Sequence, residues 1–155
     1  MKGIKTAIKN TLAGKRDPPQ AMQSRSERAL KYTFNPFDEK WHSTGCRVVV
    51  EKQPFAEGGM RFCLRIFELE DNGDFMPCVA KIFKRSSISS EAYFDEALTQ
   101  MTSECFAQDF NRQQAKYRVS FLPVSVMLLE ERQHQICCVE PMMRGEYIKH
   151  NDNDG

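Results

Sequence analysis

The chain has 155 residues, 41% of them hydrophobic, which is enough for one globular domain with a genuine core. Its 22 Lys and Arg residues nearly balance its 21 Asp and Glu residues, so the net charge of +1 provides no overall basic field for nucleic acid. The sequence shows no apolar run long enough to span a membrane and no secretory signal.

The first sixteen residues are basic, without an acidic residue, and carry Ile4, Ile8 and Leu12 at helical spacing. This pattern is typical of a basic amphipathic helix that contacts a membrane, calmodulin or an import receptor, but also of a solvated tail. Because Asp17-Pro18-Pro19 ends any helix, we interpret residues 1–20 as a basic tail or linker. Residues 21–155 then form the domain.

The domain begins, by its pattern, with a short helix over residues 21–32, and five strands follow. The strands are predicted at residues 46–52, 61–70, 75–84, 119–130 and 135–140. Asp71-Asn72-Gly73-Asp74 supplies a turn between the second and third of them. Strands in runs around a single long helix indicate an α+β domain with a curved antiparallel sheet.

The long helix is predicted over residues 90–115, after a run of serines that can cap it. Its apolar residues recur at intervals of three and four, so one face should pack on the sheet and bury Phe94, Leu98 and Met101. The same stripe continues through Cys105 and Phe110. The opposite face is interpreted as mostly solvated and contains Asp95, Glu96, Thr99, Glu104, Gln108 and Arg112.

Two basic residues in the central hairpin suggest a site for an anion. Lys81 lies between apolar neighbours on a strand, where an ammonium is costly unless an anion meets it. Gly58 and Gly59 form a turn just before Arg61, which can bring backbone N–H groups and a guanidinium to a phosphate. The alternative is that the glycines are ordinary hairpin residues, that Lys81 reaches solvent, and that Arg61 pairs with an acid such as Glu57 or Glu68.

The six cysteines form no CxxC pair and mostly lie within apolar patterns, which favours buried, reduced thiols in a cytoplasmic protein. The three histidines stand apart in the sequence, so we expect no metal site.

Four blocks of sequence, taken in order, resemble the alpha-kinases, an atypical family of serine/threonine protein kinases. The blocks are QPFAEGGMRFCLRIF, CVAKIF, FDEALTQMTSECFAQDFNRQ and CVEPMMRGEYIKHNDNDG. The resemblance covers residues 32–155. It implies that the chain binds ATP, with magnesium in the complete domain, and that the γ-phosphate passes to a protein substrate.

The resemblance also implies roles for residues that match the family's motifs. Gly58, Gly59 and Arg61 resemble the loop that covers the phosphates, and Lys81 resembles the catalytic lysine that contacts them. The backbone of Glu140 and Met143 would meet the adenine ring. Lys149 matches a further conserved element, in which His150 replaces a tyrosine. By analogy with ordinary protein kinases, an acidic residue of the long helix could hold Lys81 in position.

The resemblance extends only to the first of the family's two lobes, so the chain resembles an N-terminal kinase lobe. The catalytic aspartates, the metal-binding glutamine and the zinc site of the family would lie in the second lobe. We therefore expect the 155 residues alone to be inactive and to bind ATP weakly or undetectably. The alternative is a non-catalytic module that binds nucleotide or another protein. Calmodulin or another regulator is a possible partner of the basic N-terminus.

Overall fold

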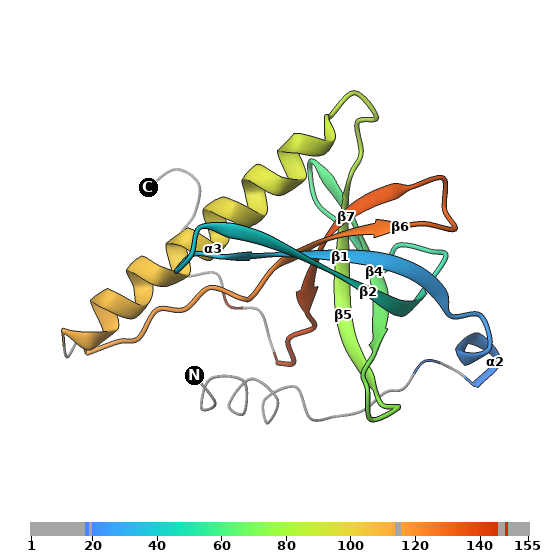
Figure 1. The fold of residues 1–155 in the computed structure, drawn as a ribbon, viewed down its shortest axis with the longest axis horizontal. Coiled ribbons are helices and arrows are strands. Elements are labelled where there is room, and N and C mark those ends of the chain that lie inside the picture. Colours follow the sequence, from blue (N-terminus) through green and yellow to red (C-terminus); the bar gives the residue numbers. More distant parts are fainter. Residues whose placement is uncertain (1–17, 19, 114–115, 146–147, 149–155) are drawn as a thin grey trace.

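A computed structural model of the chain describes residues 18, 20–113, 116–145 and 148. It contains one long helix and a sheet of seven strands, with a short helix before them (Figure 1). The elements are α2 (Gln20–Gln23), β1 (Glu27–Asn35), β2 (Lys40–Val50), β3 (Ala56–Glu57), β4 (Arg61–Leu69), β5 (Phe75–Phe83), α3 (Ser90–Arg112), β6 (Ser125–Leu129) and β7 (Gln135–Pro141). The predicted basic tail falls on residues that are mostly outside the described part.

The strands pair in the order β2-β1-β6-β7-β5-β4-β3, and every pairing is antiparallel. β2 also pairs with β4, so the sheet curls round and closes on itself. The predicted α+β class with a curved antiparallel sheet is therefore confirmed. The predicted number of strands is too low, because β1 and the two-residue β3 were not recognised.

β1 replaces the second half of the helix predicted over residues 21–32, and that prediction is wrong beyond the single turn of α2. The strand uses both of its faces. Ala29 points into the closed sheet and is buried in its core, whereas Tyr32 packs on the opposite side, against Phe94 of α3. This alternation of faces is the period-two pattern of a strand.

Two clusters of buried residues make up the core. One fills the inside of the curled sheet and includes Val48, Ile66, Ala80, Met127 and Leu129, each almost completely buried. The other lies between the outside of the sheet and α3. Its members are Tyr93, Ala97, Val124, Val126 and Cys138. Because β6 and β7 contribute to both clusters, they are buried on both faces.

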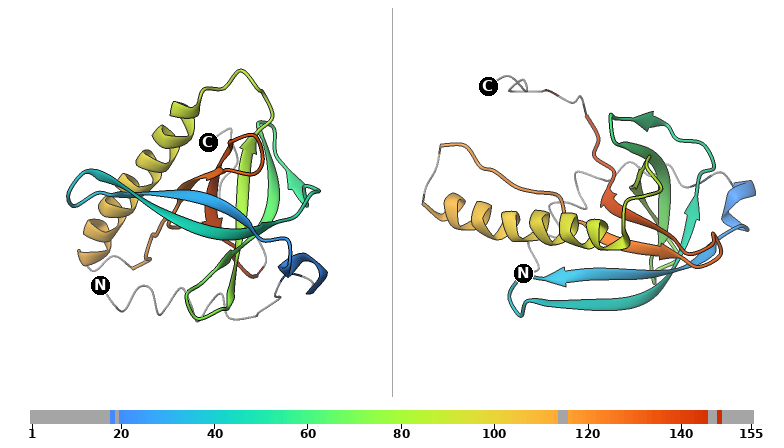
Figure 2. Two further views of the ribbon diagram at one scale, coloured as in Figure 1. Left: turned by 45° about the vertical axis from the view of Figure 1, so that its right-hand side comes forward. Right: turned by 90° about the horizontal axis from the view of Figure 1, so that it is seen from above.

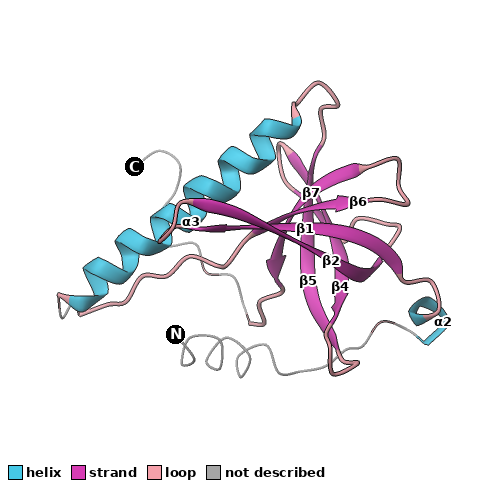
Figure 3. Ribbon diagram, viewed as in Figure 1, coloured by secondary structure: helices cyan, strands magenta, loops and turns pink. Residues whose placement is uncertain are grey.

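Helix α3 lies along the outside of the curled sheet (Figures 2 and 3). Tyr93, Ala97 and Ala107 are its buried residues, and Phe94 and Met101 are half-buried against the same cluster. The predicted burial of Leu98 is wrong, and Phe110 is also exposed. Small side chains at the contact let the helix approach the sheet closely, and this leaves the larger residues of the predicted stripe at its edges.

All six cysteines are free, and three of them, Cys78, Cys137 and Cys138, are buried. None of the helices within the described ranges has both the length and the apolarity that a membrane crossing requires.

Candidate functional site

Arg61 and Lys81 lie on neighbouring strands and on the same face of the sheet. In the β4–β5 ladder Arg61 is opposite Phe83 and Cys63 is opposite Lys81. Directly opposite residues project to the same side, and so do residues two apart on a strand. The guanidinium and the ammonium therefore both project from the outer face, on which α3 is packed. The structure thus brings together the two cations that the sequence singles out.

Lys81 forms an ion pair with Glu140 of β7. Its Nζ lies 2.7 Å from Oε2 of Glu140, whose side chain is only 9% exposed, whereas the side chain of Lys81 is 29% exposed. The kinase analogy suggests an acidic residue of the helix as the partner of Lys81. The partner is instead a residue of strand β7. The reason is the register of the sheet, which pairs residues 78–81 of β5 with residues 138–141 of β7.

Arg61 is held by the helix instead. Its Nη1 donates to Oε1 of Glu96 on α3, and both side chains are about a quarter exposed. The alternative partners considered for Arg61 are engaged elsewhere: Glu57 pairs with Lys84 and Glu68 pairs with Lys31. Glu96, interpreted above as solvated, is therefore a member of the site.

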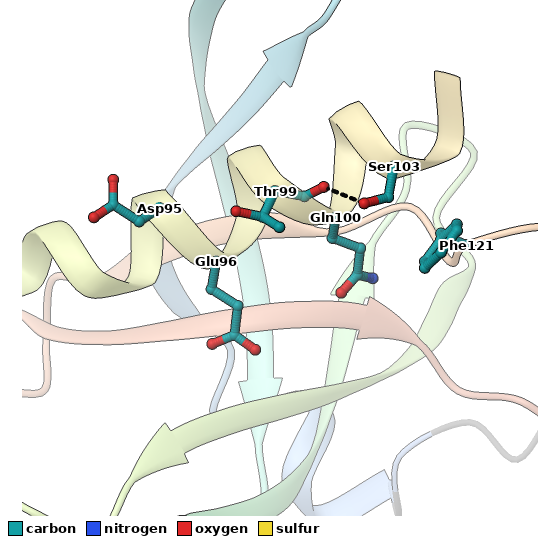
Figure 4. Close-up of a pocket in the computed structure, with 6 residues that line it drawn as sticks. All are labelled: Asp95, Glu96, Thr99, Gln100, Ser103 and Phe121. Carbon is teal, nitrogen blue, oxygen red and sulfur yellow. Dashed lines mark hydrogen bonds between the residues drawn. The ribbon is translucent and has the colours of Figure 1, made fainter. Parts of the chain in front are cut away.

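Gln100 links Glu140 to the helix. Its Nε2 donates to Oε1 of Glu140 at 3.1 Å and to the carbonyl oxygen of Leu122 at 2.8 Å. Glu96 and Gln100 are four residues apart, so they leave α3 on the same side (Figure 4). Asp95 points away from this side in the same view.

The thiol of Cys138 lies among these charges. Burial above all, together with the carboxylates of Glu96 and Glu140, raises its pKa to about 12, and the cations Arg61 and Lys81 oppose this rise. Both carboxylates and both cations therefore act on one buried atom. The four form a compact, charge-balanced cluster on the outer face of the sheet.

The glycine turn lies beside this cluster. Residues 58–60 join β3 to β4, and the turn is closed by a hydrogen bond of 2.9 Å from the N–H of Gly58 to the carbonyl oxygen of Arg61. The N–H of Lys84 donates to the carbonyl oxygen of Met60, which ties the turn to the end of β5. A Cβ at Gly58 or Gly59 would meet open space, so packing does not require glycine at either position. Their absence of side chains leaves the backbone accessible to a ligand.

The segment after β7 carries the remaining predicted residues. The N–H of Met142 donates to the carbonyl oxygen of Pro77, and Met143 is exposed just beyond it. Met143 is thus the second residue beyond the end of β7, the strand that carries Glu140. The predicted Lys149 lies outside the described residues. The described residues contain no group of three or more side chains that could hold a metal ion.

A family model for the alpha-kinases matches residues 56–155. This chain belongs to the alpha-kinase family. Two similar proteins of Dictyostelium discoideum are alpha-protein kinase 1, which is 37% identical over 88% of this chain and 10% of its own length, and myosin heavy chain kinase B, which is 32% identical over 84% of this chain and 18% of its own length. The chain therefore spans between about a tenth and a fifth of these relatives.

Solved structures show the same fold. The alpha-kinase domain of myosin heavy chain kinase A, in complex with ADP, superposes with a TM-score of 0.75 at 24% identity and covers 83% of this chain and 64% of the other. An inactive form of that domain in complex with ATP gives a TM-score of 0.74 at the same identity, over 83% of this chain and 65% of the other.

A shallow pocket in this alpha-kinase chain adjoins the charged cluster (Figure 4). Its volume is about 400 Å³. The residues that line it are Asp95, Glu96, Thr99, Gln100, Ser103 and Phe121. Glu96 and Gln100 therefore face the pocket and also bond to Arg61 and Glu140, so the pocket borders the side chains that hold both cations.

Gln100 and the side chain of Glu140 are members of the site that the motifs of this alpha-kinase chain do not single out. The position of Gln100 on the helix does carry a signal. Residues 96 and 100 follow the buried residues 93 and 97 by three positions each, which places them at the border of the packed face. The pairing of Glu140 with Lys81 depends on strand register across 59 residues and has no local signal.

Proposed function

We propose that this chain is the nucleotide-binding lobe of an alpha-type serine/threonine protein kinase and that Arg61 and Lys81 contact the phosphates of ATP. The observation that carries the proposal is that each cation is held by a carboxylate and still has donors to spare. A lysine ammonium has three N–H donors and a guanidinium has five. The bond from Lys81 to Glu140 and the bond from Arg61 to Glu96 leave the others for phosphate oxygens.

The remaining residues complete the proposed site. The backbone of Gly58 and Gly59 would cover the phosphates, and the backbone of Glu140 and Met143 would meet the adenine ring. Lys149 would contribute from the segment that follows. This assignment is supported by family membership and by the ADP and ATP complexes of the structurally similar domain. Magnesium belongs to the complete domain, where its charge would offset that of the phosphates.

The proposed reaction transfers the γ-phosphate of ATP to a protein substrate. It needs metal ligands and a group that orients the nucleophile, as well as a phosphate clamp. Arg61, Lys81 and the glycine turn would supply the clamp, and the longer relatives that the chain partly spans are named as kinases. The division into a tail over residues 1–20 and a lobe over residues 21–155, and a reducing, cytoplasmic location consistent with the buried free thiols, belong to the same proposal.

A titration of the isotope-labelled 155-residue chain with magnesium-ATP tests nucleotide binding. We expect weak binding, with amide shifts concentrated at residues 58–61, around Lys81 and at residues 140–143. The variant Lys81→Met should weaken it, whereas Lys84→Met, at a cation paired with the exposed Glu57, should not. An absence of shifts at about 10 mM ATP, or shifts confined to the far half of α3, would contradict the assignment.

The transfer reaction needs a separate test in a protein that includes the rest of the kinase domain. Lys81→Met should abolish phosphorylation of a generic substrate there, because the clamp stabilises charge on the transferring phosphoryl group. If such a protein binds ATP but transfers nothing, the function is that of a non-catalytic nucleotide-binding module.

A further inference from the structure

Helix α3 reaches the two cations of the site by different chemistry. It holds Arg61 directly, through the carboxylate of Glu96. One turn further along, it reaches Lys81 only through an intermediate, since Gln100 bonds to Glu140 and Glu140 bonds to Lys81. At the position where helix α3 faces the carboxylate of Glu140, it therefore presents the neutral amide of Gln100.

The amide of Gln100 fits this place because of its two donors. Its Nε2 donates to Oε1 of Glu140 and to the carbonyl oxygen of Leu122, at 3.1 and 2.8 Å. The second carboxylate oxygen of Glu140, Oε2, accepts from Lys81. Both oxygens of this nearly buried carboxylate thus have a donor, so its side chain is fixed in one orientation. A glutamate at position 100 would instead place two carboxylates in contact, which is unfavourable.

We propose that Gln100 is a positioning residue, which fixes the carboxylate of Glu140 and through it directs the ammonium of Lys81 along the outer face of the sheet. Its consequence for phosphate binding rests on the proposed function, whereas the coupling of Gln100 to Lys81 does not. The simpler alternative is that Gln100 only anchors the segment at Leu122 to the helix. The proposal and this alternative differ in one respect. Only under the proposal does the ion pair of Lys81 with Glu140 depend on Gln100.

The chemical reactivity of Lys81 in the 155-residue chain distinguishes them. An amine is acylated only where the reagent can reach it, so a lysine whose side chain is held against a carboxylate reacts slowly. Limiting acetic anhydride followed by mass spectrometry gives a rate for each lysine. We expect Gln100→Met to raise the rate at Lys81 about fivefold, the factor that corresponds to a weakened ion pair of this kind. The rate at Lys31, paired with Glu68, should stay unchanged and serves as the internal reference.

Gln108→Met is the matched control, because Gln108 donates to Glu104 on the same helix but has no bond to Glu140. It should leave Lys81 unchanged. The decisive comparison is a cycle with Glu140→Gln. That variant alone should raise the rate at Lys81, and adding Gln100→Met should then change it by less than about twofold, since the link is already broken. If Gln100→Met fails to fold, Gln100→Asn keeps the amide but is one methylene too short and should give the same rise.

The proposal is overturned if a folded Gln100→Met chain acylates Lys81 at the wild-type rate, or if its effect adds in full to that of Glu140→Gln. The measurement uses no nucleotide. A positive result with no ATP binding would therefore remove the proposed function and leave the positioning role of Gln100 intact.

Discussion

Replacing Lys81 by Ala should destabilise the chain, because it removes the cation that offsets a nearly buried carboxylate. Glu140 would keep its hydrogen bond from Gln100 but lose its charge partner. Removing one member of a fully buried ion pair costs about 3–5 kcal/mol. The side chain of Lys81 is 29% exposed, so water can partly replace it and the cost should fall to about 1–2 kcal/mol.

Lys84→Ala is the matched control for this prediction. The side chain of Lys84 is also 29% exposed, but its partner Glu57 is 63% exposed and remains hydrated when the lysine is removed. The loss should then be below about 0.5 kcal/mol. The two variants thus remove the same chemical group at the same exposure and differ in the burial of the acid left behind.

Urea unfolding followed by the fluorescence of Trp41, the single tryptophan of the chain, measures both free energies. Trp41 packs against Phe34 and Phe94 and should report the loss of the helix–sheet contact. Adding Glu140→Gln to Lys81→Ala should recover most of the loss, since no charge is then left buried. Equal, small losses in Lys81→Ala and Lys84→Ala would refute the reasoning.

Three further predictions test other parts of the fold. Arg132→Ala should cost about 2–3 kcal/mol in urea unfolding, because the guanidinium pairs with the buried Glu27 at 2.7 Å and donates to the carbonyl oxygen of Val50; a loss below that of Lys84→Ala would contradict this. Ala97→Leu should cost about 1–3 kcal/mol of unfolding free energy by overpacking the helix–sheet contact. Phe106→Ser, at a residue that is 71% exposed, should change stability little and should reduce the light scattering caused by self-association. A larger loss in Phe106→Ser than in Ala97→Leu would mean that α3 packs by its other face. At pH 8 iodoacetamide should spare the thiols whose pKa is raised by burial to about 12, since only about one in ten thousand is ionised, and their rates should rise only as the pH approaches that value; rapid labelling in the folded chain would contradict their burial. These thiols are Cys78, Cys137 and Cys138.

The parts of the fold that local pattern determines were predictable. The hairpin of β4 and β5 follows from two apolar runs and a turn in which Gly73 adopts a positive φ of 82°, a conformation that favours glycine. The start of α3 at Ser90 and its course to Arg112 follow from its periodicity, although Ser89 at the N-cap makes no side-chain capping hydrogen bond. β1 shows no clear apolar alternation, because its inner face carries the polar residues Glu27, Lys31 and Thr33 beside Ala29. The ion pair of Lys31 with Glu68 of β4 makes its position acceptable, and such a partner is invisible in a local window.

The candidate site divides in the same way. Arg61 and Lys81 stand out locally, as a cation beside a glycine turn and a cation within an apolar strand. Their partners depend on tertiary structure. Glu140 contacts Lys81 through the pairing of β5 with β7. Glu96 contacts Arg61 through the packing of α3 on the outer face of the sheet. The apolar stripe of α3 overestimates the buried face, since Leu98 and Phe110 match the helical period but lie beyond the width of the contact.

The closure of the sheet has a consequence for how the chain is made. Ala29 of β1 pairs with Leu129 of β6, about 100 positions later, so a ribosome needs about 5–20 seconds to supply the partner after β1 has emerged. During that interval β1 can pair with β2 but presents its other edge to any strand nearby. Lys31 lies on this edge, where a charged side chain discourages pairing between chains. Lys31 would thus protect the unfinished sheet, and in the completed fold its charge is offset by Glu68 at 2.7 Å.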